Sequence, residues 1–234
     1  MRLVHGSALA AAFALLIPSV IGAQGQETAR AVADGGISVP GWTGKIDANE
    51  EKKGEVLKNA KLSGTPDALS VTTGPAVTYW NPANKASGDY TVKATFTESK
   101  YMNLNDHPHP YGLVIAGNDM GTADQSYLYC ATYGNGNFIV RGFGPAPFQM
   151  NGRRGEANAA VNKAAGPGQS VKQEIAMSVK GGNVECAING TVVATYDKAA
   201  VAAPGKLKST DGIYGIRFGH NTEATVTGLA VTKP

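Results

Sequence analysis

Two histidines lie two positions apart in a proline-rich stretch, residues 103–110, with the sequence NLNDHPHP. His107 and His109 could ligate a metal ion or transfer protons, because neutral imidazole titrates near neutral pH. The same residues are also typical of a polar surface loop that its prolines make stiff. A metal site needs at least a third ligand and the sequence assigns none, so we expect no resident metal.

Aromatic side chains recur further along the chain with the spacing of a strand. Tyr127 and Tyr129 alternate with Leu128 and Cys130, and alternate residues of a strand share one face of the sheet. A row of tyrosines can stack on sugar rings and offer hydroxyl groups. It can also cover a hydrophobic core. If Leu128 and Cys130 point inward, the tyrosines line the exposed face.

Two arginines extend this candidate surface. Arg217 points away from the core if its two neighbours face it, and its planar guanidinium could then bond hydroxyl or carboxylate groups. The alternative is a solvated or ion-paired arginine. Arg141 raises the same question, because its facing depends on the register of the preceding turn. His220 and Asn221 follow the strand of Arg217 and could form a rim.

The chain has two cysteines, Cys130 and Cys186. Metal binding would require more thiols or a close cluster with histidine, so two alternatives remain. An oxidising compartment favours a disulfide. Burial within strands favours inert thiols, and only a short distance between the two Cα atoms would permit the bridge.

The first 23 residues have the features of a signal peptide. Arg2 precedes an apolar run, and small residues follow at Gly22 and Ala23. Cleavage is expected after Ala23 or Gly22, which predicts a secreted or periplasmic protein. No later stretch approaches the roughly 20 apolar residues of a membrane span. The net charge is +3, and the two signs are interspersed, which argues against nucleic acid as a partner.

The remaining chain predicts an all-β fold. Residues 24–40 lack a sustained period and suggest a flexible leader, and residues 41–234 are expected to form one domain. In YTVKATF, residues 90–96, apolar and polar side chains alternate with strand period. Turns at residues 134–137 and at Asn189 and Gly190 predict two hairpins. Many short strands between turn residues indicate a two-sheet antiparallel jelly-roll β-sandwich.

Five segments follow one another along the chain: DYTVKATF, YGLVIAGND, YLYCATYGNGNFIVRGF, IAMSVKGGNVECAINGTVVATYD and GIYGIRFGHNTEATVTGLAVT. Their order resembles the concanavalin A-like lectin/glucanase superfamily in its laminin-G-like form. The resemblance covers about residues 42–232. The chain is also similar to secreted bacterial proteins near the domain of unknown function 1080, a group associated with 3-keto-disaccharide hydrolysis.

The resemblance implies a site on the concave face of the sandwich. Family-16 glucanases of this fold carry acidic residues alternating along one strand, since retaining hydrolysis needs two carboxyl groups about 5 to 5.5 Å apart. No strand of this chain has that pattern, so the leading prediction is an exported, non-catalytic domain that binds a carbohydrate or glycan surface. Its predicted ligand-binding residues are Tyr127, Tyr129, Arg141, Arg217, His220 and Asn221.

Two alternatives remain open. A glycoside-processing enzyme of the 3-keto-disaccharide type would use His107, His109 or Glu156 as its acid or base, and an envelope protein-interaction domain would bind a protein instead. Laminin-G-like relatives also suggest calcium at Asp119 and Asp124. These two residues alone do not supply six to eight oxygen ligands, so no cofactor is expected. The sequence leaves the oligomeric state open.

Overall fold

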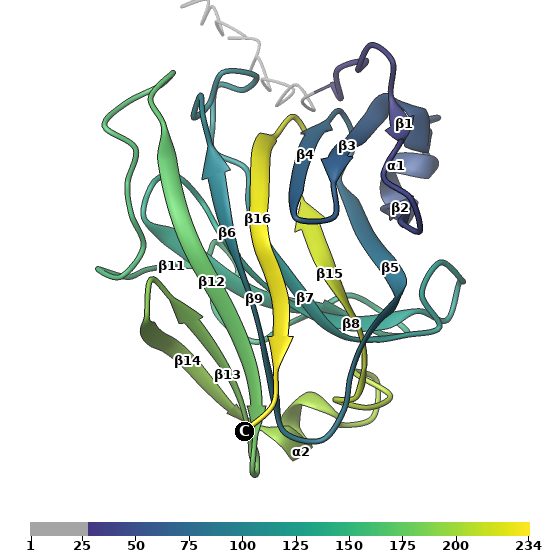
Figure 1. The fold of residues 1–234 in the computed structure, drawn as a ribbon, viewed down its shortest axis with the longest axis vertical. Helices are drawn as coiled ribbons and strands as arrows, with labels where there is room; N and C mark the ends of the chain where they lie inside the picture. Colours follow the sequence, from purple (N-terminus) through teal and green to yellow (C-terminus); the bar gives the residue numbers. More distant parts are fainter. Residues whose placement is uncertain (1–27) are drawn as a thin grey trace, which may run out of the picture.

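The computed structural model describes residues 28–234, which form a two-layer β-sandwich (Figure 1). The predicted signal peptide, residues 1–23, lies outside the described residues. Sheet 1 has the strand order β1 (Gly36–Ile37), β3 (Ala60–Thr65), β4 (Ala68–Thr73), β16 (Glu223–Thr232), β6 (Tyr90–Glu98), β12 (Val171–Lys180), β13 (Asn183–Ile188) and β14 (Thr191–Asp197). The yellow strand β16 lies between β4 and β6 in Figure 1.

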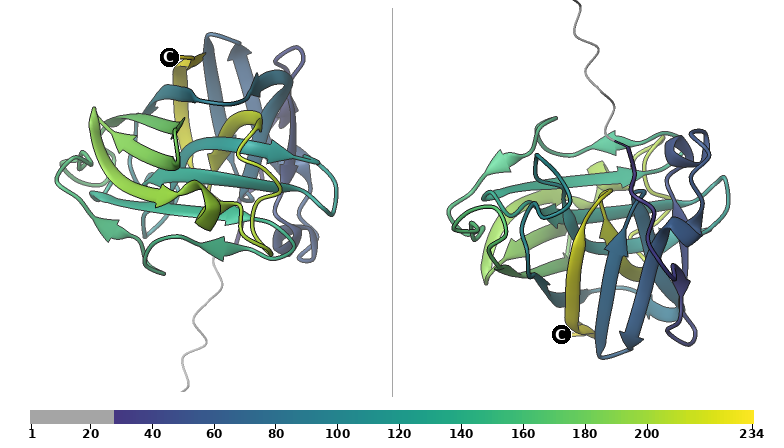
Figure 2. Two further views of the ribbon diagram at one scale, coloured as in Figure 1. Left: turned by 90° about the horizontal axis from the view of Figure 1, so that it is seen from below. Right: turned by 90° about the horizontal axis from the view of Figure 1, so that it is seen from above.

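Sheet 2 forms the second layer, which Figure 2 shows from two ends of the molecule. Its strand order is β10 (Phe148–Gln149), β9 (Asn137–Phe143), β8 (Ser126–Thr132), β7 (Tyr111–Asn118), β15 (Gly212–Phe218), β5 (Val77–Ala86) and β2 (Thr43–Ile46), and β11 (Glu156–Ala157) also pairs with β9. All named strand pairs are antiparallel except β1 with β3. The prediction of an all-β antiparallel sandwich is confirmed.

Both predicted hairpins are present. Strand β8 pairs with β9 from Tyr127 opposite Phe143 to Thr132 opposite Phe138. Strand β13 pairs with β14 across Asn189 and Gly190, whose φ angles are 49° and 82°. Two positive φ angles in succession are what a tight type I′ hairpin turn needs, and Asn followed by Gly adopts them at low cost.

A disulfide between Cys130 and Cys186 crosses the core between the two sheets. Cys130 belongs to β8 in sheet 2 and Cys186 to β13 in sheet 1, and their Cα atoms are 6.2 Å apart. Both residues are buried within the main hydrophobic cluster. Of the two alternatives left by the sequence, the structure therefore has the disulfide.

The segment before the first long strand differs from the expected flexible leader in its described part. Strand β1 pairs with β3 through Gly36 and Ile37, and the side chain of Val39 is buried in the core. The backbone N–H of Arg30 donates a hydrogen bond of 3.0 Å to the side chain of Asn221. Residues 28–40 are held by these backbone and side-chain contacts, which a composition-based argument does not detect.

Helical structure is confined to short pieces: α1 (Ala48–Glu51), the 3₁₀ turn η1 (Leu57–Asn59) and α2 (Lys198–Val201). Within residues 28–234, none of the helices has the length and apolar character needed to cross a bilayer. Helix α1 follows β2 directly and places its first turn beside the outer face of sheet 2, where the candidate site lies.

Candidate functional site

A second hydrophobic cluster lies on the outer face of sheet 2, away from the main core. It contains Val114, Tyr127, Tyr129, Ala131 and Ile139. The intervening residues of β8 belong to the main core between the sheets. The tyrosines therefore point outward, as strand alternation requires when their neighbours point inward.

The tyrosines are nevertheless covered, which corrects the expectation of an open aromatic face. Tyr127 is only 1% exposed and Tyr129 6%. The ring of Phe143 lies 5.0 Å from that of Tyr127 between centroids, and the hydroxyl groups of Thr78 and Tyr127 are 2.9 Å apart. Tyr127 is thus a packed residue whose hydroxyl group is bonded within the protein.

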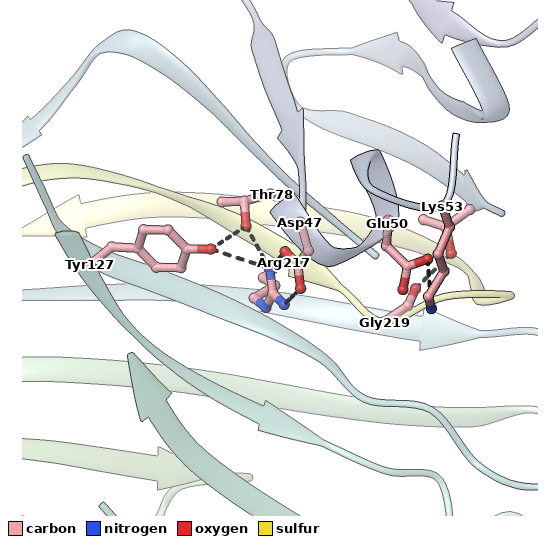
Figure 3. A network of polar contacts seen from close by, with 8 residues as sticks. Asp47, Glu50, Lys53, Thr78, Tyr127, Arg217 and Gly219 are labelled. Atoms are coloured by element: carbon pink, nitrogen blue, oxygen red, sulfur yellow. Dashed lines mark hydrogen bonds and ion pairs between the residues drawn. The ribbon is translucent and has the colours of Figure 1, made fainter. Parts of the chain in front are cut away.

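Arg217 is bonded at the centre of this face (Figure 3). Its Nη1 donates to Asp47 at 2.8 Å, to Thr78 at 3.0 Å and to the Tyr127 hydroxyl at 3.2 Å. Its Nη2 donates to the second carboxylate oxygen of Asp47 at 2.6 Å. Of the two alternatives for Arg217, the structure has the ion-paired arginine, in the bidentate geometry that suits guanidinium and carboxylate.

The environment of Arg217 keeps it charged although it is buried. Burial lowers the pKa of Arg217, but the nearby carboxylate of Asp47 outweighs this effect and leaves the pKa well above its ordinary value. Its guanidinium carbon lies 4.9 Å from the ring centroid of Tyr129 and 4.9 Å from that of Phe143. Cation–π attraction of this kind adds to the ion pair in fixing the two rings.

A cleft of about 730 Å³ opens above these residues on the outer face of sheet 2. Tyr129, Arg141, Phe143 and Arg217 line it from the sheet. The end of β2 and the start of α1 line one side, the β7–β8 loop another, and the segment that leads into β10 a third. The residues from these three segments are Lys45, Asp47, Ala48, Asn49, Glu51, Lys52, Thr122, Ala123, Gln125, Gly144, Pro145, Ala146, Pro147, Phe148 and Gln149, with Gly142 from β9.

Arg141 lies between Tyr129 and Gln149 in the strand register. Its Nη2 donates a hydrogen bond to the carbonyl of Arg153, which ties β9 to the long segment after β10. Arg141 is only partly buried, and its side chain lines the cleft. Arg141 therefore presents a planar cationic group beside an aromatic ring, an arrangement that can bond and stack on a polar ring-shaped ligand.

Asn221 is placed apart from the cleft and has a structural role. It is 3% exposed, its Oδ1 accepts from the Arg30 N–H, and its Nδ2 donates to the Thr28 carbonyl at 3.2 Å. The expectation that Asn221 forms part of a binding rim is therefore replaced by a role in holding the described start of the chain.

The other candidate residues also lie outside the cleft lining. His107, His109 and His220 gather with one another at the end of β15. Glu156 is exposed on β11 at the edge of sheet 2. Asp119 forms an ion pair with Lys208. Among the described residues, neither Asp119 nor Asp124 belongs to a group of three or more side chains that could hold a metal ion.

Asp47, Phe143 and Gln149 are among the cleft residues that were not predicted from the sequence. Phe143 ends the β9 segment and its outward position follows from the register opposite Tyr127, so the hairpin pattern contained that signal. Asp47 carried no signal of its pairing, because its partner lies 170 residues away. Gln149 lies in a segment that the sequence showed only as irregular.

No protein-family model and no curated protein sequence matches the chain. Solved structures do match it over most of its length. The carbohydrate binding module CBM66 from Bacillus subtilis has a TM-score of 0.54 at 8% identity, covering 85% of this chain and 99% of that chain. The endo-beta-1,3-glucanase from Pyrococcus furiosus has a TM-score of 0.52 at 12% identity, covering 82% and 88%.

A protein of unknown function with a galectin-like fold from Bacillus subtilis also matches, with a TM-score of 0.50 at 14% identity, covering 82% of this chain and 89% of that chain. At such identities the likeness concerns the fold alone. The chain therefore has the galectin-like, concanavalin A-like sandwich fold.

Proposed function

We propose that this chain binds carbohydrate in the cleft on the outer face of sheet 2 and does not catalyse its cleavage. The observation that carries the proposal is the cleft itself, whose sheet side holds the partly exposed Phe143 and Arg141 next to the nearly covered ring of Tyr129. Its volume of about 730 Å³ lies within the usual range of small-ligand sites, roughly 300 to 1,000 Å³. Aromatic rings beside planar polar groups suit the flat faces and hydroxyl edges of sugar rings.

The fold comparison supports the same ligand class. Two structures with TM-scores above 0.5 are named as a carbohydrate binding module and an endo-beta-1,3-glucanase. Because both a binding module and an enzyme occur among them, the choice between binding and catalysis depends on the residues of the cleft.

Those residues favour binding. The cleft lining has two carboxyl groups, Asp47 and Glu51, and both come from one short segment that spans α1 and the residue before it. Asp47 uses both oxygens to bond Arg217. Hydrolysis of a glycosidic bond requires two carboxyl groups that flank the bond. A pair on one wall, with one member held by arginine, does not offer this arrangement.

Glycan-array binding followed by titration calorimetry tests the proposal. We expect weak saccharide binding in the wild type, and loss of at least about tenfold in affinity, or 1.4 kcal/mol, in Arg141→Ala and in Gln149→Ala. Gln149 is exposed, so its substitution leaves packing intact. Gln169→Ala, an exposed glutamine outside the cleft, is the matched control and should bind as wild type.

Absence of binding to every saccharide at millimolar concentration would refute the carbohydrate proposal. Binding that Arg141→Ala and Gln149→Ala leave unchanged would instead move the site away from the cleft. An unchanged saccharide after prolonged incubation is expected for a binding domain, whereas product formation would refute the non-catalytic part.

The enzyme alternative, a 3-keto-disaccharide hydrolase, has less support. The strand register places Tyr111 opposite Thr132, Thr132 opposite Phe138, and Phe138 opposite Glu156. Three strand spacings of about 4.8 Å put Glu156 roughly 14 Å from the start of β7, next to which His109 lies. Glu156 and the histidines therefore do not share one site. A turnover assay on 3-keto-glycosides separates the two functions.

Export belongs to the proposal as well. The Cys130–Cys186 disulfide is the kind of bond that forms and persists in oxidising compartments, which supports a secreted or periplasmic location. Fractionation of expressing cells, with detection of a protein that has lost its first 23 residues, tests this part.

A further inference from the structure

Three histidines from two distant parts of the chain meet at the end of sheet 2. His107 and His109 precede β7, and His220 lies in the turn between β15 and β16. The ring centroids of His107 and His109 are 4.5 Å apart, and those of His109 and His220 are 3.9 Å apart. One ligand nitrogen from each ring lies within 4.8 Å of the other two.

The backbone brings these segments into direct contact. The N–H of Gly219 donates a hydrogen bond of 2.7 Å to the carbonyl of Pro110. A Cβ atom at position 219 would lie 2.9 Å from the Cδ of Pro110 and 3.3 Å from the Cβ of His109. Only glycine allows so close an approach, and this approach places His220 against His109.

The turn that carries His220 is held on several sides. Asn105 donates to the carbonyl of Asn221 at 2.6 Å, and the N–H of Thr222 donates to the hydroxyl of Thr73 at 2.9 Å. The hydroxyl of Thr222 donates to the carbonyl of His220 at 3.2 Å. These bonds fix the backbone beneath the ring, so the cluster is formed before any ligand arrives.

An acidic group accompanies the first histidine. Nδ1 of His107 lies 2.6 Å from a carboxylate oxygen of Asp106. A carboxylate on one ring nitrogen fixes the tautomer of a histidine and makes the other nitrogen the ligating atom, which is the usual outer partner of a metal-bound imidazole. The cluster thus has both the ligands and one orienting group of a metal centre.

We propose that His107, His109 and His220 bind one divalent transition-metal ion, for which Zn²⁺ is the probe. Imidazole nitrogen suits Zn²⁺, Cu²⁺ and Ni²⁺, whereas Ca²⁺ and Mg²⁺ require oxygen ligands. Two nitrogens at about 2.1 Å from a tetrahedral ion are roughly 3.4 Å apart. The rings reach this spacing from within 4.8 Å by small side-chain rotations. The side chain of His107 is 54% exposed, so an ion can reach the cluster from solvent.

The proposed ion would join the segment before β7 to the turn after β15. Coordination by both segments stabilises the folded chain by an amount that grows with the free ion concentration relative to its Kd, because the unfolded chain does not hold the three rings together. This site is independent of the carbohydrate cleft, whose lining contains none of the three histidines.

Titration calorimetry with ZnCl₂ tests the site, on protein purified without a histidine tag and treated with a chelator. We expect one Zn²⁺ per chain with a micromolar or lower Kd, and a higher Tm with Zn²⁺. His109→Ala should weaken binding by at least about 100-fold, and Asp106→Asn by roughly 10- to 100-fold, as for other outer partners. Asn103→Ala, an exposed residue of the same loop, is the control and should bind as wild type.

A measurement on the wild type alone tests the proposal even if a variant fails to fold. Zn²⁺ should shift the imidazole NMR signals of three histidines together, with saturation at one equivalent, while Mg²⁺ should shift none. The proposal would be overturned if calorimetry gave no heat of Zn²⁺ binding and the imidazole NMR signals did not shift with Zn²⁺. Unchanged affinity in a folded His109→Ala variant would overturn it as well.

Discussion

Glu98 is a buried carboxyl group whose protonation should make the stability of this protein depend on pH. It ends β6 and is 7% exposed, and its Oε2 has no hydrogen-bond partner among residues 28–234. The backbone of Gly134 packs close to that oxygen, since a Cβ atom added at this glycine would lie 3.1 Å from it. Burial raises the pKa of Glu98 from 4.5 to about 7, although a hydrogen bond from the backbone of Met102 lowers it in part.

The raised pKa of Glu98 determines whether the free energy of unfolding rises or falls with pH. Between pH 4.5 and about pH 7 the folded chain keeps a proton on Glu98 that the unfolded chain has lost. The resulting stabilisation is fully present below pH 4.5 and is lost as the pH rises through 7. From pH 5 to pH 8, the free energy of unfolding should fall by about 2.5 kcal/mol from this group.

Denaturant unfolding of wild type and Glu98→Gln at pH 5 and pH 8 measures this effect. The amide is neutral at both pH values, so the variant should lack the contribution of about 2.5 kcal/mol. Comparing wild type with variant cancels the titration of the histidines. Glu174→Gln, an exposed carboxyl group of β12, is the control and should keep the wild-type pH dependence. The reasoning would be refuted if the free energy of unfolding changed equally between pH 5 and pH 8 in wild type and in Glu98→Gln.

Three further predictions concern stability. Reduction of the disulfide, or Cys130→Ala with Cys186→Ala, should lower the free energy of unfolding by about 4 kcal/mol, because the bridge closes a loop of 56 residues; an unchanged midpoint in reducing buffer would contradict this. Asp47→Ala should cost about 3 to 5 kcal/mol, since it leaves the buried charge of Arg217 unpaired, and a thermal midpoint equal to wild type would show that water replaces the carboxylate. Gly112→Ala should yield little folded protein by circular dichroism, because a Cβ atom there would overlap the carbonyl of Cys130, and normal folding would count against that steric argument.

Much of the sandwich could be predicted from the sequence because its signals act over a few residues. The alternation in β6 and the turns at Asn189 and Gly190 depend on neighbours along the chain. Each hairpin aligns its own two strands, so Tyr127 and Phe143 share one face of the sheet, but the sequence left open whether that face points outward. The burial of Tyr127 did not follow, because Thr78 and Arg217, which also contact it, come from β5 and β15.

The candidate sites depend on pairings that local patterns do not encode. Arg217 meets Asp47 across 170 residues, and this pair exists because β15 lies beside β5, which pairs in turn with β2. The sequence assigned no third ligand to His107 and His109, because His220 lies more than 100 residues further along the chain. Strand β15 pairs with β7, and this neighbourhood brings His220 to His109.

The sequence by itself therefore determined the strand pattern, the hairpins and which residues of a strand share a face, since backbone geometry imposes a period of two. The tertiary structure alone decided which faces are covered, whether the cysteines are bonded, and which charged and imidazole groups meet. Those outcomes depend on the order of strands within each sheet and on the packing of segments far apart in the chain.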